Sequence, residues 1–353
     1  MPVNFANLQP VSPYLTGFVC TSRPKLADQL ISRAVLPRVQ VESPNSAGTI
    51  FVDTASSFLG GPQGIERAPG APMASGTSAD PSTVTFATKI YSFASKPLPQ
   101  EIIARSQLPE NLGEREAEFV QNKIAIEEEK RVASLLFTAG NWTSTVALTA
   151  VTNGSGAKFS SAAAGKPFND IEKAIEMFRL QSNGIDPTDI VIGRLVASDL
   201  KVHPEIRGLY VVTSGAGAIG MPVSDQALKD LFMNVFNVRL HIGKLRYNTA
   251  APGQAASYSD AWTDSMWIGC LDPAQAAGST VYAGNTAALG IDEMAAIVAT
   301  GNATLSNLTG IPMIAGFDVL SPTQGNAVVV YGQQQCTEKL LNADLGFVVT
   351  DCN

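Results

Sequence analysis

The alternation of hydrophobic and polar positions divides this chain into segments of different character. Up to residue 45, six prolines leave room for one short helix, over 25–33, in an otherwise extended arm. Residues 48–52 and 84–90 are short β-rich runs, typical of the two legs of a hairpin. Between the legs, residues 60–81 include nine glycines and prolines among 22 positions, too many to form a core within the segment.

A long helix is predicted over 114–139, where neither glycine nor proline occurs. At about 1.5 Å per residue it spans roughly 40 Å. Its apolar residues fall on two opposite sides, which predicts two buried faces. One side carries Ala117, Val120, Ile124, Val132 and Leu135, and the other carries Phe119, Ile126, Ala133 and Phe137.

A polar run, EEEKR at 127–131, interrupts the apolar positions of this helix. Glu127 and Arg131 are four residues apart, a spacing that allows an ion pair worth a few tenths of a kcal/mol. We interpret the run as a solvated flank of the helix, in preference to a catalytic cluster of carboxylates.

The middle of the chain alternates helix and strand patterns. Apolar residues at spacings of 3, 4 and 3 predict an amphipathic helix over 168–182, with Asn169 and Glu172 as a capping box. A mixed α/β lobe is completed by strands at 189–193, 237–243 and 265–270 and by helices that end near 203 and 232. Closing strands are predicted at 316–320, 327–331 and 345–349.

Composition narrows the class of protein. A length of 353 residues suggests two lobes or one domain with large insertions. Only 16% of residues are charged and 45% are hydrophobic, against roughly 25% charged in typical soluble domains. No run approaches the roughly 18 to 20 apolar residues of a membrane-spanning helix, and the N-terminus has no signal-peptide pattern. We therefore expect a soluble, non-secreted protein that buries much of its surface against other protein.

Few residues indicate chemistry. The four cysteines form no CxxC pair, and His203 and His241 are interpreted as structural or exposed, so we expect no metal and no cofactor. The net charge of −7 argues against a protein that reads nucleic acid through tight phosphate contacts.

One motif suggests a different class of function. Gly215, Gly217 and Gly220 match G-x-G-x-x-G after a possible strand at 209–213, the pattern that holds a dinucleotide pyrophosphate. That pattern requires an acidic residue about 20 positions further on, and none occurs between Asp230 and Asp260. We therefore favour a flexible loop and no enzymatic activity, with a nucleotide-binding enzyme as the remote alternative.

The order of these segments resembles that of the tailed-phage major capsid proteins of the Hong Kong 97-type fold, which encapsulin shells share. The phrases that carry the resemblance are AVLPRV at 34–39, EAEFVQNKIAIEEEKRVASLLF at 116–137, NDI at 169–171, IVIG at 190–193, HPEIR at 203–207 and DLGF at 344–347. The resemblance implies an α+β fold. Its parts are an N-terminal arm (1–45), an extended E-loop hairpin (46–95), a peripheral domain with a spine helix (96–144), an axial α/β domain (145–300) and peripheral return strands (301–353).

The resemblance also implies a function. The chain would self-assemble as pentamers and hexamers into an icosahedral shell around double-stranded DNA, in the host bacterial cytoplasm and then in the virion capsid. An encapsulin-type nanocompartment shell is the alternative, although encapsulins usually begin with a helix rather than a proline-broken arm. The implied assembly residues are Phe58, Leu59, Ile65, Arg67 and Met73 at the E-loop tip, Phe119, Ile126, Phe137, Glu127 and Arg131 on the spine helix, and Gly215, Gly217 and Gly220 in an axial loop.

Two departures from the family shape the expected partners. Some relatives join subunits through an E-loop lysine, but residues 41–88 contain no lysine and Lys89 lies at the hairpin base, so no such crosslink is expected. Some relatives begin with a cleavable scaffolding segment of about a hundred residues, whereas the arm and hairpin here already occupy that part of the chain. We therefore expect a separate scaffolding protein, or none. The resemblance further implies a portal and optional cement proteins as partners, and no membrane.

Overall fold

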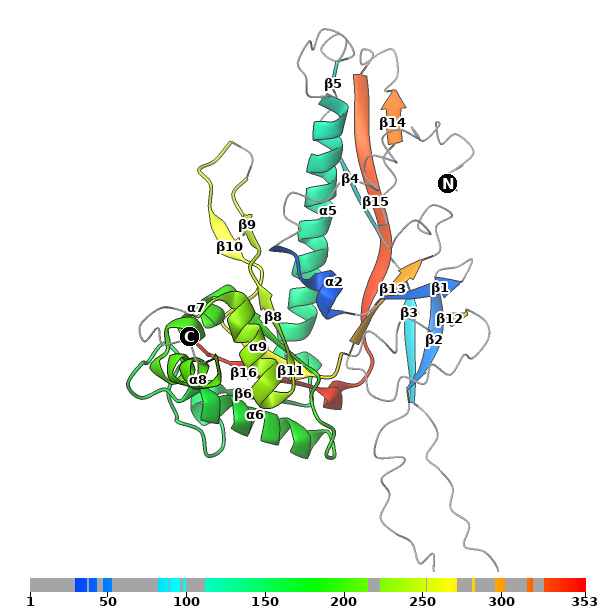
Figure 1. The fold of residues 1–353 in the computed structure, drawn as a ribbon. Helices are drawn as coiled ribbons and strands as arrows, with labels where there is room; N and C mark the ends of the chain where they lie inside the picture. Colours follow the sequence, from blue (N-terminus) through cyan, green and yellow to red (C-terminus); the bar gives the residue numbers. More distant parts are fainter. Residues whose placement is uncertain are drawn as a thin grey trace, which may run out of the picture.

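The computed structural model describes residues 29–36, 38–42, 47–52, 82–87, 89–95, 98–99, 112–214, 223–251, 253–271, 281–282, 296–301, 316–319 and 327–353. These residues form two sheets connected by one long helix, with a two-stranded hairpin and a two-stranded ribbon beside them (Figure 1). Within this part of the chain, no helix combines the length and apolar character that crossing a membrane requires.

The long helix α5 (Leu112–Phe137) confirms the prediction made from the absence of glycine and proline. It lies along strand β15 (Ala327–Leu340), the central strand of a seven-stranded sheet (Figure 1). β15 pairs with β4 (Lys89–Ala94) and β5 (Leu98–Pro99) on one side, and with β13 (Ala296–Gly301) and β14 (Gly316–Val319) on the other. Parallel pairs add β1 (Arg38–Glu42) and β12 (Val281–Tyr282). The strand predicted at 327–331 is longer in the structure. β15 continues to residue 340, because main-chain pairing with β4 and β13 extends it through and beyond the polar run 333–335.

The predicted hairpin is present as β2 (Ala47–Val52) paired antiparallel with β3 (Ser82–Ala87). Its second leg was expected to continue through Ile90, but β3 ends at residue 87 and Ile90 belongs to β4, in the large sheet. The five E-loop tip residues, Phe58, Leu59, Ile65, Arg67 and Met73, lie outside the described residues. In the arm, residues 25–28 also lie outside them, and residues 30 and 31 are not helical; the helical turn is α2 (Ser32–Val35).

The α/β lobe contains the second sheet, with strand order β6, β16, β11, β7, β8. These strands span Ser144–Ala147, Gly346–Thr350, Met266–Gly269, Asp189–Gly193 and Arg239–Gly243. The lobe helices are α6 (Pro167–Gln181), α7 (Arg194–Val202), α8 (Pro204–Ser214) and α9 (Asp225–Phe236). The ribbon consists of β9 (Arg246–Asn248) and β10 (Tyr258–Asp260). Short 3-10 turns occupy Ala139–Asn141, Leu148–Ala150 and Ala343–Leu345.

Two local predictions in the lobe are wrong. No capping box forms on α6, because the helix begins at Pro167 with Lys166 as its N-cap and without a side-chain cap. Asp170 instead accepts hydrogen bonds from the backbone nitrogen and hydroxyl of Ser155, at 2.5 and 2.6 Å. The strand expected at 209–213 is part of α8, because that helix starts at Pro204 and packs on α6, α7 and α9, and this packing overrides the local β propensity.

The two sheets exchange segments across the domain boundary expected at residue 300. β16, from the last few residues of the chain, inserts between β6 and β11 in the lobe. β12 and β13, which precede residue 302, belong to the sheet beside α5. The seven-stranded sheet beside α5 and the lobe sheet are therefore interlocked by the path of the chain.

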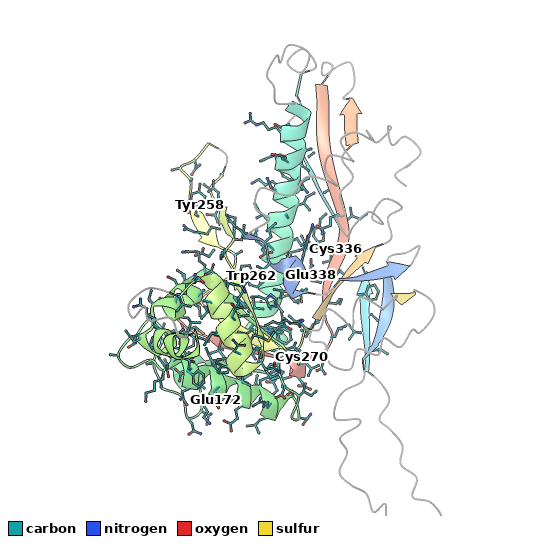
Figure 2. All side chains as sticks on the ribbon, in the orientation of Figure 1. Glu172, Tyr258, Trp262, Cys270, Cys336 and Glu338 are labelled. Carbon is teal, nitrogen blue, oxygen red and sulfur yellow. The ribbon has the colours of Figure 1, made fainter. Side chains whose placement is uncertain are left out.

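Tryptophan rings fill the lobe where two strands carry glycine. Trp262 lies at the edge of the lobe beside α5 (Figure 2), and a Cβ at Gly243 would overlap its ring. A Cβ at Gly346 would likewise overlap the ring of Trp142. Trp142 in turn packs on Trp267, with ring centroids 5.5 Å apart. These glycines provide space for large side chains, which is a packing requirement.

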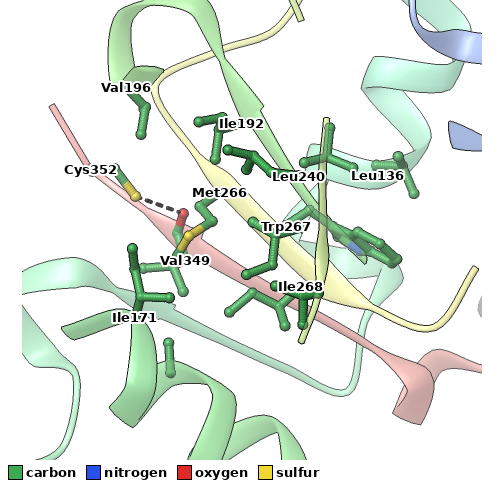
Figure 3. Packing of buried hydrophobic residues seen from close by; sticks show 14 of the residues in the cluster. Leu136, Ile171, Ile192, Val196, Leu240, Met266, Trp267, Ile268, Val349 and Cys352 are labelled. Carbon is green, nitrogen blue, oxygen red and sulfur yellow. Dashed lines mark hydrogen bonds between the residues drawn. The ribbon is translucent and has the colours of Figure 1, made fainter. Parts of the chain in front are cut away.

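One continuous core extends from the lobe sheet into α5 (Figure 3). Every residue of β7 is buried, as expected for a strand with both faces covered. Ile192 of β7, Met266 of β11 and Val349 of β16 belong to this core, and Leu136 brings the C-terminal end of α5 into it. The lobe and the spine helix therefore share one hydrophobic core.

Candidate assembly site

Glu129 of α5 lies at the meeting point of three parts of the chain. Its side chain is fully buried, and Oε2 accepts a hydrogen bond from Ser32 N at 2.7 Å. Ile31 N lies 3.0 and 3.1 Å from the two carboxylate oxygens. The indole Nε1 of Trp262 donates to Oε1 at 2.7 Å. One carboxylate therefore connects the arm and the lobe to the spine helix.

Glu128 faces the arm and the large sheet. It is also buried, and it accepts a hydrogen bond from Gln334 Nε2 of β15 at 3.0 Å. The Arg33 guanidinium lies 3.9 Å from the same carboxylate oxygen. Glu128 therefore holds β15 and the arm against the same turn of α5.

Arg131 also connects α5 to the sheet. Its Nε donates to Glu338 of β15 at 3.0 Å, and its guanidinium stacks on the Tyr91 ring of β4, 3.7 Å from the centroid. Cys336 and Glu338 lie on the part of β15 that faces this contact (Figure 2). Burial raises the pKa of Tyr91 above its ordinary value, and the Arg131 charge opposes that change.

These contacts correct the interpretation of 127–131 as a solvated flank. Glu128 and Glu129 are buried, and Glu127 bridges to Lys130 at 3.2 Å instead of to Arg131. Lys130 in turn lies over the Tyr247 ring of the ribbon, 4.9 Å from the centroid. The expected solvation is wrong for Glu128 and Glu129, because donors from other elements cover them, whereas Glu127 is exposed.

A signal for this burial was present in the sequence. The buried residues of α5 recur at spacings of three and four, through Ala117, Gln121, Ile124, Glu128 and Val132. Extending the apolar stripe by this spacing through its two polar members would have predicted that Glu128 faces inward. The partners of Glu129 gave no such signal, because they are 98 and 133 residues away in the chain.

The second apolar side of α5 is only partly covered. Phe137 is half-buried and packs edge-to-face on Trp262, with centroids 5.4 Å apart, and Ile126 is half-buried. Phe119 remains 44% exposed and meets Phe93 of β4 edge-to-face at 5.8 Å. Between α5 and β4 runs a groove of about 460 Å³, whose lining includes Ile90, Phe93, Lys123 and Ile124.

The histidines have structural partners, as expected. His203 is buried, and its Nδ1 lies 3.3 Å from Glu205 N. His241 lies 2.9 Å from Asp189, which also accepts two hydrogen bonds from Arg239, at 2.9 and 2.7 Å. Burial alone would raise the pKa of Asp189, but the hydrogen bonds from His241, Arg239 and Thr188 outweigh it and keep the pKa below its ordinary value.

Other candidate chemistry is sparse in the described part of the chain. Cys270, Cys336 and Cys352 are buried, and no group of three metal-ligating side chains occurs among the described residues. Gly215, Gly217 and Gly220 lie outside them. The residues before this loop form helix α8, so the strand that a dinucleotide site requires is not there.

Comparison with known proteins shows which solved structures have a similar fold. No protein-family model matches the chain, and no curated protein sequence matches it. Among solved structures, a phage-related protein from Bordetella bronchiseptica RB50 is similar with a TM-score of 0.61 at 19% identity, over 97% of both chains. The chain has the α+β fold of Hong Kong 97-type phage capsid proteins.

Two phage structures also match, with lower scores. Microbacterium phage Oxtober96 gives a TM-score of 0.49 at 10% identity over 91% of both chains. The mature capsid of bacteriophage PhiM1 gives 0.48 at 12% identity, over 91% of this chain and 87% of that one. The α+β capsid fold predicted from the order of segments is confirmed by the similarity to the phage-related protein, whereas the assignment of α5 as the spine helix and of the lobe as the axial domain stays a prediction.

Proposed function

We propose that this chain is the major subunit of a phage capsid, which self-assembles as pentamers and hexamers into an icosahedral shell enclosing double-stranded DNA. The observation that carries the proposal is the fold, which extends over 97% of the chain. In this fold a long helix lies along one sheet, with a hairpin and a lobe beside it. Such an architecture suits the side-by-side packing of identical subunits in a shell.

Surface composition supports self-association. Large apolar side chains are exposed on several elements of the single chain, including Ile90 and Phe93 on β4, Phe119 on α5 and Tyr258 on the ribbon. Contiguous exposed apolar surface marks protein interfaces. The hairpin β2–β3 forms a two-stranded sheet of its own, and such a hairpin is only marginally stable in isolation. Neighbouring subunits would cover both features.

Charge is compatible with enclosed DNA. With a net charge of −7, the shell would not bind phosphates tightly, and packaged DNA would be retained by confinement without sequence-specific contacts. In this proposal the partners are a separate scaffolding protein, a portal and cement proteins, and assembly occurs in the host bacterial cytoplasm. The proposal assigns no catalytic role to the chain.

The test is to purify the chain after expression in bacteria and to examine it by size-exclusion chromatography and negative-stain electron microscopy. We expect closed shells with pentamers and hexamers. Co-expression with the neighbouring phage genes should give particles that contain nuclease-protected DNA. Shells that enclose an enzyme cargo instead would assign the chain to the encapsulins, and a monomer that binds a dinucleotide would refute the proposal.

A further inference from the structure

We propose that Glu129 is a latch that fixes the arm to the spine helix and couples the position of the arm to that of the lobe. The donors come from two separate parts of the chain: Ile31 N and Ser32 N from the arm, and Trp262 Nε1 from the loop between β10 and β11. Their only shared acceptor among these contacts is the Glu129 carboxylate. The proposal concerns the single subunit and does not depend on the shell function.

The site requires an acceptor on both of its sides. Backbone amides and the indole N–H can only donate, so each carboxylate oxygen must receive hydrogen bonds. Oε1 faces Trp262 and Oε2 faces Ser32, with Ile31 N near both. Glu129 is 0% exposed and Ser32 and Trp262 are nearly so; a donor that loses its acceptor here is therefore not compensated by solvent.

A glutamine cannot replace this carboxylate. It has nearly the same shape, but it presents one acceptor oxygen and one NH2 group, which can only donate. If its oxygen faces the arm, its NH2 group meets the indole N–H of Trp262. If it is turned around, its NH2 group meets Ser32 N but can donate to the Ser32 hydroxyl, which also contacts Glu129, so we expect this second orientation. Glu129→Gln therefore has to break one of the two connections.

Apolar packing also holds this part of the arm. The experiment therefore has to distinguish the effect of packing from that of the hydrogen bonds to Glu129. Val35 and Leu36 are buried in the shared core, so α2 would keep some contact with α5 without Glu129. In addition to this packing, Glu129 holds two backbone amides, that of Ile31, which precedes α2, and that of Ser32, which begins it. Loss of Glu129 should free residues 29–33 more than residues 35–36.

The experiment is hydrogen–deuterium exchange on the full-length, unassembled chain, with peptides that cover residues 29–36. In Glu129→Gln we expect the amide of Ser32 to exchange at least about tenfold faster than in the parent, because the turned glutamine leaves Ser32 N without its buried acceptor, whereas Ile31 N lies close to both side-chain oxygen positions and keeps one. Glu127→Gln, an exposed glutamate two positions earlier on the same helix, serves as the matched control and should leave exchange unchanged.

A second substitution separates the latch from packing. Trp262→Phe removes the indole donor, so in the double variant E129Q/W262F the glutamine NH2 group can face the phenylalanine ring while its oxygen accepts from Ser32 N. We expect the double variant to regain slow exchange in the arm. A role through packing alone predicts that the double variant is no better protected than E129Q, and that result would overturn the proposal.

Failure of a variant to fold is also informative. If E129Q alone does not fold, the latch requires that E129Q/W262F does, since the mismatch between two donors is then removed. An unfolded double variant would count against the proposal, as would fast exchange of Ile31 and Ser32 in the parent chain.

Discussion

At the scale of single residues, buried carboxylates organise this protein. Glu129, Asp170 and Asp189 are each almost completely buried, and each accepts at least two hydrogen bonds from residues outside its own helix or strand. A buried charge is tolerated when donors satisfy it. Burial raises the pKa of Glu129 despite its hydrogen bonds from Ile31, Ser32 and Trp262, whereas the partners of Asp189 lower its pKa. Ionisation of Glu129 as the pH rises therefore lowers the free energy of unfolding, whereas ionisation of Asp189 raises it.

Asp189→Asn should destabilise the chain in a pH-dependent manner. The folded-state pKa of Asp189 lies below its ordinary value. The contribution of its charge to the free energy of unfolding is therefore complete above about pH 4 and is lost as the pH falls through the folded-state pKa. We expect a loss of about 2 kcal/mol at pH 7 and a smaller difference from the parent at pH 3. Urea unfolding followed by circular dichroism at both pH values measures it.

The control for this prediction is Asp186→Asn. Asp186 is exposed and paired with Arg179, and exposed ion pairs contribute little, so this variant should unfold like the parent within about 0.5 kcal/mol. An Asp189→Asn deficit that stayed the same at pH 7 and pH 3 would show that the charge of Asp189 is not what stabilises the fold.

At the scale of elements, the packing of rings against glycines decides how strands and helices meet. Gly243 ends β8 where the Trp262 ring lies, and the same ring contacts Phe137 of α5 and donates to Glu129. One large side chain thus sets the distance between the lobe sheet and the spine helix. A change at Gly243 should therefore affect two elements.

Gly243→Ala should destabilise the lobe by about 1 to 3 kcal/mol, because the added methyl overlaps the buried ring of Trp262. Thermal unfolding of the purified variant checks this. Gly208→Ala is the matched control, since nothing lies near its added methyl and alanine favours helix α8 by up to about 1 kcal/mol. Equal stability of the two variants would contradict the packing argument.

At the scale of the whole molecule, the two sheets are interlocked, but part of the apolar surface of the single chain stays exposed. The C-terminal end of α5 shares the core of the lobe, whereas the N-terminal half of α5 presents Phe119 beside Phe93, which lines an open groove. In the proposed shell, another copy of the chain would cover this surface.

Phe119→Glu should lower assembly without unfolding the subunit. Phe119 is 44% exposed in the single chain, so the substitution costs little in folding, but a charge in a buried contact between subunits would weaken association at least about tenfold. Sedimentation analysis compares the variant with Phe119→Leu, which keeps the surface apolar and should assemble. Normal particles from Phe119→Glu would remove this surface from the assembly contacts.

Assembled particles should dissociate fully in hot denaturing detergent. No lysine occurs at 41–88, and Lys89 lies in β4 of the large sheet, so the hairpin loop offers no lysine for an isopeptide bond. We expect one band of monomer size on a gel. A ladder of multimers would contradict this expectation.

The sequence by itself predicted several of the regular elements that the structure describes. The absence of glycine and proline predicted α5, the 3-4-3 spacing predicted α6, and short apolar runs predicted β7, β11 and β16, because these signals are local. Their order was enough to indicate the capsid fold. The strand expected at 209–213 failed because packing around α8 outweighs a short β-rich run.

Only the tertiary structure decided what lies opposite each side chain. Glu128 and Glu129 looked like solvated residues because a helical pattern records which residues share a side, but not which donors approach that side. The partners Ser32, Gln334 and Trp262 come from distant segments, brought together by a core that the whole chain builds. The same reason explains why β16 could be predicted as a strand from its residues but not as a member of the lobe sheet.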